Sequence, residues 1–541
     1  MPDTPDRSAA PDIQTLGQLK ASGYRPRSVK EEMRANLIAR LRAGTPVFPG
    51  ILGFERSVIP QVQHAILAKH DMILLGLRGQ AKSRLVRMLP SLLDEWVPVV
   101  QGSEVNDDPM RPISKLARDL VAERGDETPV GWLHRSARYG EKLATPDTSI
   151  ADLVGDIDPI KAATRKLTYA DEEVIHFGLI PRTNRGIFAI NELPDLQPRI
   201  QVGLLNVMEE QDVQIRGFNV RLPLDVAMVF TANPEDYTNR GSIITPLKDR
   251  IDSQILTHYP RSIEIGVQIT KQEAWQERQD GRTDTPTVHV PHYFREIVEQ
   301  VAFEARESEY VDQKSGVSAR LTRAALEDLI SAAERRALLA GEAETTLRPM
   351  DLQAVEPAVT GKVELVYEGE QEGPQQVARA LVGRAVAAIF KRYFPDPGQK
   401  SPGGGAADRA AQSMARRRAQ QEGRPVEPTG REVYQPITAW FAKGNTLDLE
   451  PGMPFLDYAK ALDQVDGLRA LVKQHTDAAT PAETASAMEW VLEALHQHSL
   501  LGKDVAADGT SYADMMGSVL GQIGGFGDDD DDLEDYRRRF G

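Results

Sequence analysis

Short apolar runs alternate with amphipathic stretches along the first half of the chain. The runs MILL (72–75), IFAI (187–190) and VAMVF (226–230) are bounded by polar residues or Gly, as buried strands are. Apolar residues at helical spacing predict helices over residues 28–42, 58–70, 84–93 and 200–210. Further strand signals lie at 93–100 and 253–258, and a hairpin signal lies at 212–222. Residues 102–146 are polar and predict no clear element.

The first strand leads into the sequence GLRGQAKS and then into a helix. This order is typical of a phosphate-binding loop, in which backbone N–H groups and a helix N-terminus hold phosphates. The Lys reaches the β- and γ-phosphate oxygens, and the Ser hydroxyl contacts Mg²⁺. The candidate ATP-binding residues are Gly76, Arg78, Gly79, Gln80, Ala81, Lys82 and Ser83. Ala81 replaces the usual last Gly, which costs backbone freedom if φ is positive there.

Polar residues follow two later strands. Asn191 and Glu192 follow IFAI, where a nucleotide hydrolase places its Mg²⁺-binding and water-activating acids. We predict Glu192 as the catalytic base and Asn191 as a weaker Mg²⁺ residue in place of Asp. Asn233 follows VAMVFTA and is suited to sense the γ-phosphate and orient water. Taken alone, IFAINE is equally compatible with a capped core strand, and Asn233 by itself is better explained as a turn-forming Asn-Pro.

Two arginines and an apolar turn complete the candidate site. Arg250 is predicted at a helix end, where it is suited to reach a neighbouring subunit's γ-phosphate as an arginine finger; Arg240 is a second candidate. Arg320 is predicted on the first turn of a later helix, with Arg323 as the fallback. The turn at 48–54, with Ile51 and Leu52, either holds an adenine ring or is a plain linker packed on the core.

Composition excludes several classes of protein. The net charge of −16 disfavours a nucleic-acid motor, and the absence of Cys excludes disulfides and thiolate sites. No apolar run approaches the roughly 20 residues of a membrane helix, and the first residues lack a signal-peptide pattern, so a cytoplasmic location is expected. The histidine pairs 289/292 and 496/498 are interpreted as surface residues without carboxylate neighbours rather than as metal ligands.

The second half is predicted to be mainly helical. Helices are expected at 268–279, 293–307, 319–339, 375–393, 434–441, 454–475 and 481–498. A flexible linker is expected at about 395–430, and an acidic disordered tail around 528–532. The predicted domains are an N-terminal helical extension (1–45), a nucleotide-binding core (46–261), a helical lid (262–370) and a helical C-terminal region (371–541).

The order of these motifs resembles that of AAA+ ATPases, in particular the magnesium-chelatase ATPase (I) subunit and MoxR-type ATPases. The matching segments are FPGILGF (48–54), GLRGQAKS (76–83), ATPDTSIADLVGDIDPIKA (144–162), GLIPRTNRGIFAINEL (178–193), LLNVMEEQDVQIRG (204–217), TANPED (231–236) and PLKDRID (246–252). The resemblance implies an α/β fold: a parallel P-loop sheet flanked by helices, with an α-helical lid and a further mostly helical C-terminal region. It also implies an inserted helix after Ala144–Ala162.

The resemblance implies Walker A at Lys82 and Ser83, Walker B at Asn191 and Glu192, sensor 1 at Asn233, an arginine finger at Arg250 and sensor 2 at Arg320. It implies ATP and Mg²⁺, a homo-oligomeric, hexameric ring, and a partner with a von Willebrand A domain. The expected function is an ATP-hydrolysing motor that remodels a partner or drives metal insertion by it. The alternatives are a MoxR-type chaperone or a nucleotide-switched scaffold with weak hydrolysis, which Ala81 and Asn191 motivate. A σ54-type activator lacks support, because its GAFTGA loop is missing.

Overall fold

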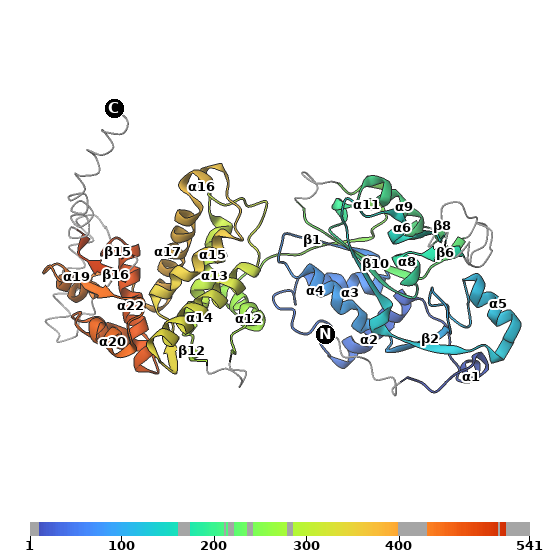
Figure 1. The fold of residues 1–541 in the computed structure, drawn as a ribbon, viewed down its shortest axis with the longest axis horizontal. Coiled ribbons are helices and arrows are strands. Elements are labelled where there is room, and N and C mark those ends of the chain that lie inside the picture. The colour runs from blue at the N-terminus through green and yellow to red at the C-terminus, as the bar shows by residue number, and fades with distance from the viewer. Residues whose placement is uncertain are drawn as a thin grey trace, which may run out of the picture. The chain divides into compact units, whose positions relative to one another are not determined.

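The computed structural model describes residues 10–158, 160, 174–209, 212–214, 221–234, 242–278, 285–398, 430–506 and 509–515. The chain divides into two compact units, Met1–Tyr259 and Pro260–Gly541 (Figure 1). Most of the predicted linker, residues 399–429, lies outside the described residues, as does the acidic tail. The predicted inserted helix also falls largely outside them, since only residue 160 is described between 159 and 173.

A five-stranded parallel sheet forms the centre of the first unit, in the order β11-β1-β10-β7-β4. Its strands are β1 (Met72–Leu75), β4 (Tyr139–Leu143), β7 (Gly186–Asn191), β10 (Val226–Ala232) and β11 (Ser253–Leu256). Leu75, the last residue of β1, lies opposite Ala232 and Leu256. Because the strands are parallel, the loops that follow them emerge at one edge of the sheet.

Alternate strand residues enter two separate hydrophobic cores, as the two-residue period of a strand requires. Met72 and Leu74 of β1 pack with α2 (Val29–Ala43), α3 (Val58–Ala68) and α4 (Lys82–Met88). Ile73 and Leu75 pack on the other face. The helices there are α6 (Ile150–Leu153), α8 (Leu179–Arg182), α9 (Pro198–Glu209) and α11 (Thr245–Asp249). The predicted fold class, an α/β core of a parallel sheet flanked by helices, is confirmed.

The polar segment that predicted no element supplies the sheet's edge strand, β4. The strand expected at 93–100 exists as β2 (Trp96–Val100), but it pairs antiparallel with β3 (Val130–His134) outside the parallel sheet. Two further antiparallel pairs are β5 (Gly155–Ile157) with β6 (Ile175–Phe177), and β8 (Asp212–Gln214) with β9 (Arg221–Pro223). The remaining helical segments of this unit are α1 (Leu16–Ala21), α5 (Lys115–Arg124) and the 3₁₀ turns η2 (Leu89–Leu92), η3 (Gly125–Glu127), η4 (Arg135–Arg138) and η6 (Leu193–Asp195).

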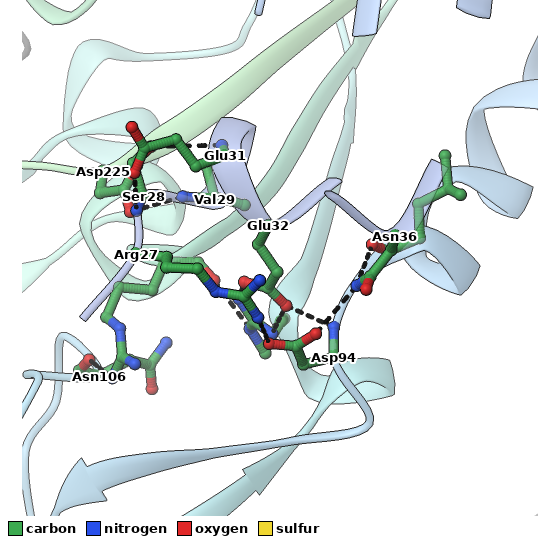
Figure 2. A network of polar contacts seen from close by, with 12 residues as sticks. Arg27, Ser28, Val29, Glu31, Glu32, Asn36, Asp94, Asn106 and Asp225 are labelled. Carbon is green, nitrogen blue, oxygen red and sulfur yellow. Dashed lines mark hydrogen bonds and ion pairs between the residues drawn. The ribbon is translucent and has the colours of Figure 1, made fainter. Parts of the chain in front are cut away.

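Helix α2 is tied to this core by a polar network at its N-terminus (Figure 2). Ser28 and Glu31 form a capping box, and the Val29 N–H donates to the Asp225 carboxylate at 2.8 Å. Deeper in the network, the Glu32 carboxylate accepts one hydrogen bond from each terminal nitrogen of Arg138, both at 2.7 Å. Both side chains are at most 5% exposed. Helix α2 is therefore an integral part of the first unit.

Replacing Arg138 by Ala is expected to destabilise the first unit by about 3–5 kcal/mol, because it leaves the Glu32 carboxylate buried without its counter-ion. Arg27→Ala is the matched control, since Arg27 pairs with Asp94 at 45% side-chain exposure and such pairs contribute at most about 1 kcal/mol. Urea unfolding followed by circular dichroism measures both. Equal midpoints for the two variants would contradict the prediction, whereas partial recovery in Glu32→Leu/Arg138→Leu would support it.

The second unit is mainly helical and shares one hydrophobic core from Tyr293 to Tyr512. Its helices are α12 (Ile263–Glu273), α13 (His292–Glu307), α14 (Arg320–Ala340), α15 (Glu356–Thr360), α16 (Tyr367–Glu372), α17 (Pro374–Tyr393), α19 (Gln435–Phe441), α20 (Phe455–Asp463), α21 (Leu468–His475) and α22 (Pro481–Gln497). It also contains the 3₁₀ turns η7 (Pro349–Val355) and η8 (Gly430–Tyr434), and the parallel pair β12 (Thr287–His289) and β13 (Glu344–Thr346). Helix α17 packs against both α13 and α22.

Aromatic side chains join the lid helices to the C-terminal helices. The Trp490 ring of α22 is fully buried and stacks on Tyr293 of α13, with centroids 4.1 Å apart. Phe390 of α17 meets the same Trp490 ring edge-on at 5.4 Å. Because these contacts lie in one core, α17 and α22 stabilise α13 by packing on it.

Two features of the C-terminal region differ from the sequence-based expectation. The helix expected at 454–475 is broken into α20 and α21 at Gly467, whose φ of 79° belongs to the left-handed region that favours Gly. The region also contains an antiparallel sheet in the order β14-β16-β15. Its strands are β14 (Leu447–Leu449), β15 (Gly502–Ala506) and β16 (Gly509–Ala513). These strands were not predicted, because their alternation of apolar and polar residues is short and the helical periodicity of the neighbouring segments is stronger.

A buried carboxyl on α22 makes the stability of this unit depend on pH. Glu489 accepts hydrogen bonds from the Tyr458 hydroxyl at 2.6 Å and the Met350 N–H at 2.9 Å. Burial raises its pKa from 4.5 to about 7. The folded state therefore holds this proton more tightly than the unfolded chain does, so the contribution of Glu489 to stability is full below pH 4.5 and is lost as the pH rises through 7.

Glu489→Gln is expected to remove this loss, because a neutral amide can accept from Met350 and donate to Tyr458 at every pH. Relative to the variant, the wild type should lose up to about 3 kcal/mol of unfolding free energy between pH 5 and pH 8. Thermal melts across this range test the difference, with Glu450→Gln, an exposed glutamate of the same unit, as the control. Parallel pH profiles for wild type and Glu489→Gln would contradict it.

Within the described residues, none of the helices combines the length and the apolar character needed to cross a membrane.

Candidate functional site

The Gly-rich loop between β1 and α4 is held from the side by residues that follow β11. The Thr257 hydroxyl donates to Gln80 Oε1 at 2.7 Å, and the Tyr259 hydroxyl donates to the Arg78 carbonyl at 2.9 Å. A Cβ on Gly76 would lie 1.9 Å from Thr257 Oγ1 and 2.2 Å from Gln80 Oε1, so only Gly fits there. The loop is therefore fixed in shape by the neighbouring strand.

Lys82 points its ammonium back into the loop. Its Nζ donates to the carbonyl oxygens of Gly76 and Leu77, the latter at 3.1 Å, and the residue is only 7% exposed. Gly79 and Ala81 both have positive φ, 72° and 53°. The cost expected for Ala81 is thus present, about 1–2 kcal/mol for a residue with a Cβ in the left-handed region. The loop has the shape of an anion cradle with a buried cation inside it.

The polar residues after β7 are locked by hydrogen bonds. Asn191 is 7% exposed, and its Oδ1 accepts from the Thr231 hydroxyl of β10 at 3.1 Å. The Glu192 N–H donates to the same hydroxyl at 3.2 Å. Glu192 has φ 53° and ψ 53°, a left-handed conformation that costs energy for a residue with a side chain and that is enriched at functional sites. Thr231 thus fixes the predicted catalytic base relative to Asn191.

A carboxylate that the sequence interpretation missed lies beside Asn191. Glu141 of β4 accepts from Asn191 Nδ2 at 2.5 Å and from Arg87 of α4 through two hydrogen bonds of 2.9 Å. These hydrogen bonds, those from Arg87 first, hold the pKa of Glu141 below its usual range despite partial burial. The signals available in the sequence were weak: a lone Glu in the polar stretch YGEKL, and an Arg four residues after Ser83.

Asn233 follows β10 directly and is 7% exposed, two residues beyond Thr231. Strands β1, β10 and β7 are neighbours in the sheet and run in the same direction. The phosphate-loop residues, Asn233 and Glu192 therefore occupy the carboxyl edge of three adjacent strands, where ligands of open α/β sheets bind.

The apolar turn at 48–54 is linked to the same loop through β11. Ile51 is buried in the core with Phe54, and Leu52 is half-buried. The Phe54 ring meets His258 edge-on at 5.1 Å, next to the Tyr259 that holds the phosphate loop. Ile51 is thus mainly a core residue, and of the two predicted adenine contacts Leu52 is the more accessible.

Arg250 is engaged by an acid of its own subunit. It caps the end of α11 and forms an ion pair with Glu209 of α9, through Nε at 2.9 Å and Nη2 at 2.5 Å. Its Nη1 donates to the Pro246 carbonyl. The side chain is 29% exposed, so a neighbouring molecule can reach it. The second arginine candidate, Arg240, lies outside the described residues.

Arg320 belongs to the second unit, where it is the first residue of α14. It is exposed, and its N–H donates to the Ser318 hydroxyl at 3.1 Å, while Ala319 is the N-cap residue of the helix. The fallback Arg323 lies 3.8 Å from Glu327 one turn later. Both arginines therefore lie in the first turn of α14 and are exposed to solvent.

The loop and strand ends fit Mg²⁺–ATP. The Cβ-free cradle at Gly76 and the buried Lys82 ammonium suit a polyphosphate. The oxygen donors Ser83 and Asn191 suit Mg²⁺, which prefers few protein ligands together with nucleotide phosphates and water. An amide oxygen has two lone pairs, so Asn191 Oδ1 keeps acceptor capacity while Thr231 donates to it.

Elsewhere in the described ranges, His, Cys, Asp and Glu residues form no group of three or more that could hold a metal ion. The histidines do have single carboxylate neighbours, contrary to expectation: His289 lies 3.5 Å from Glu344, and His498 lies 4.0 Å from Asp396. His498 is also only 13% exposed in its side chain, so it is not a surface residue. Burial lowers its pKa.

No protein-family model matches the chain. The structure is similar to that of NtrX from Brucella abortus, with a TM-score of 0.32 and 15% identity over 55% of this chain and 56% of that one, so the chain spans little more than half of NtrX. It is similar to a Cytophaga hutchinsonii protein assigned as an ATPase (TM-score 0.26, 15% identity, 68% and 97% covered). It is also similar to the complex of magnesium-chelatase subunits BchI and BchD (TM-score 0.31, 21% identity, 60% and 98% covered). The α/β fold is established by the order and direction of the strands in the parallel sheet, independently of these similarities.

Proposed function

We propose that this chain is an ATP-binding and ATP-hydrolysing subunit of a ring-forming AAA+ motor of the magnesium-chelatase/MoxR type. The observation that carries the proposal is the convergence of the phosphate loop, Glu192 and Asn233 at the carboxyl edge of β1, β7 and β10. A lone Gly-rich loop is weak evidence, but a loop Lys, a Glu and an Asn on three neighbouring strands match the parts that phosphoryl transfer to water requires.

In this mechanism the chain's own residues position ATP and water. The Lys82 ammonium exchanges its carbonyl partners for β- and γ-phosphate oxygens. Glu192, fixed through Thr231, accepts the proton of the attacking water, and Asn233 orients that water. Bound Mg²⁺ neutralises phosphate charge, with Ser83 and Asn191 as the residues that would hold it. Arg250 is assigned to the γ-phosphate of a neighbouring subunit, and Arg320 to the nucleotide as sensor 2.

The proposed assembly is a homo-hexameric ring whose partner carries a von Willebrand A domain, in keeping with the motif resemblance. A cytoplasmic location and the absence of nucleic-acid binding remain predictions from composition and from the charge of −16. The sequence offers no porphyrin site, so metal insertion would be carried out by the partner.

A nucleotide-switched scaffold is the second candidate, and one observation favours it. Asn191 stands where a carboxylate is usual, and its side chain is held at both ends, by Thr231 and by Glu141. A site restrained in this way binds ATP but hydrolyses it slowly if the amide is a poor substitute for Asp.

A pull-down from cell extract tests the proposed role. Glu192→Gln with ATP is expected to hold the assembly in its loaded state, and Lys82→Ala is the matched control that cannot load. Recovery by Glu192→Gln alone of a von Willebrand A-domain protein, identified by mass spectrometry, supports the motor. A large porphyrin-binding subunit in the same eluate would assign it to chelation, and other clients would assign it to MoxR-like remodelling. Identical eluates from both variants would count against a motor.

A further inference from the structure

The neutral Asn191 and the acidic Glu141 form a matched pair across two neighbouring strands. Asn191 ends β7, and Glu141 lies on the edge strand β4, which pairs with β7 in parallel. A carboxylate only accepts hydrogen bonds, so the amide NH₂ of Asn191 must face Glu141, at 2.5 Å, and its oxygen must face the Thr231 hydroxyl. The orientation of the amide is thus dictated by both neighbours.

Arg87 holds Glu141 in this place. It lies four residues after Ser83 on α4, so both side chains are on the same face of that helix. Its two hydrogen bonds of 2.9 Å grip both carboxylate oxygens, and the Tyr139 hydroxyl adds a third contact at 3.1 Å. The Glu141 side chain is 21% exposed and that of Arg87 is 62% exposed. The carboxylate is therefore fixed against Asn191 and tied to the helix that carries Ser83.

A carboxylate that accepts from the NH₂ group of an amide increases the negative charge on the oxygen of the same amide. Hydrogen bonds in series polarise one another, so the charge of Glu141 makes Asn191 Oδ1 a stronger acceptor than an ordinary amide oxygen. An Asp at position 191 would instead put two carboxylates in contact, and like charges at that distance do not both stay ionised. The carboxylate is thus on β4 instead of β7, and Asn191 is the neutral residue on β7 that can donate a hydrogen bond to it.

We infer that Glu141 is a positioning residue of the proposed nucleotide site, which supplies through Asn191 the negative charge that Mg²⁺ requires at the end of β7. This inference rests on the proposed function. It explains why the Asn is compatible with Mg²⁺ binding, and it adds to the predicted site a residue outside every sequence motif. The same hydrogen-bond chain continues through Thr231 to the N–H of Glu192, so Glu141 also restrains the predicted base.

Mg²⁺ titration of ATP binding tests the inference without relying on hydrolysis. A fluorescent ATP analogue is bound to wild type and to Glu141→Gln, Asn191→Asp and the double variant, first in EDTA and then at rising Mg²⁺. Glu141→Gln is expected to raise the Mg²⁺ concentration for half-maximal binding about tenfold, the usual lower effect of losing a residue that supports a metal ligand. Binding in EDTA should stay unchanged. Glu123→Gln, on the exposed side of α5, is the matched control.

The double variant Glu141→Gln/Asn191→Asp decides the matter, because it returns the carboxylate to β7 and leaves an amide on β4. It should restore the wild-type Mg²⁺ dependence, whereas Asn191→Asp alone should not improve on wild type. An unchanged Mg²⁺ dependence in Glu141→Gln, or loss of its ATP binding even in EDTA, would overturn the inference and leave the proposed function standing. Absence of ATP binding by the wild type at any Mg²⁺ concentration would overturn the proposed function.

Discussion

Replacing Lys82 by Ala is expected to abolish detectable ATP binding and to lower ATP turnover by about 10³-fold, the order of a lost transition-state charge contact. The buried ammonium is held in the loop by the carbonyls of Gly76 and Leu77, which lets it meet phosphate oxygens without a large rearrangement. No other Lys of the chain lies in this loop. Equilibrium binding of a fluorescent ATP analogue and steady-state phosphate release measure the two effects.

Lys20→Ala is the control for charge removal, because Lys20 is half-exposed and pairs with Asp126 on the surface. It should bind and hydrolyse ATP as the wild type does. Lys82→Arg separates charge from fit: it keeps the cation, but its planar guanidinium is too broad for the space that the Lys ammonium occupies, so it should also fail to support turnover. Retention of wild-type turnover by Lys82→Ala would remove the phosphate loop from the mechanism.

Replacing Arg250 by Ala is expected to lower turnover by about 10³-fold while leaving ATP binding intact, because an arginine finger stabilises charge that develops only in the transition state. Its ion pair with Glu209 is partly exposed and contributes at most about 1 kcal/mol, so the residue can leave that pair for a neighbouring nucleotide. Phosphate release is measured for the variant alone and in mixtures with Lys82→Ala.

The mixtures distinguish a finger acting in trans from a structural arginine. Lys82→Ala subunits cannot hydrolyse ATP but still carry Arg250, so mixing them with Arg250→Ala subunits should recover measurable turnover. Glu209→Gln removes the ion pair and keeps the arginine, and it should hydrolyse ATP nearly as the wild type does. Arg199→Ala, an exposed residue of the same helix α9, is the control. A Glu209→Gln variant as inactive as Arg250→Ala, with no recovery in mixtures, would assign Arg250 a structural role.

The sequence predicted the parts of the molecule that are encoded locally. Strands β1, β7 and β10 are continuous apolar runs because both of their faces are buried, and the loop after β1 has its own Gly and Lys signals. The positive φ at Ala81 agrees with the Gly that usually occupies this position of the loop, because Gly is favoured where φ is positive. Helix α14 was predicted within one residue at each end by its helical periodicity.

The missed features depend on contacts between distant segments. Strand β4 is an edge strand with mixed polarity, and its place beside β7 follows from the sheet rather than from the residues YGEKL. The contacts of Glu141 join segments about 50 residues apart, which no single-sequence pattern reveals. Trp490 and Tyr293 stack across nearly 200 residues, so the shared core of lid and C-terminal helices was likewise hidden. Local patterns therefore predicted the strand, loop and helix of the candidate nucleotide site, and packing supplied the residues that support them.

The most direct test of the central claim is the steady-state ATP turnover of the wild type beside that of Glu192→Gln. The substitution keeps the size of the side chain and removes its ability to take a proton, so ATP binding is retained. If the chain is a hydrolysing motor, the wild type turns over at least about 10²-fold faster than the variant, the usual contribution of a general base. Equal rates for the two proteins would contradict the account and identify the chain as a nucleotide-switched scaffold.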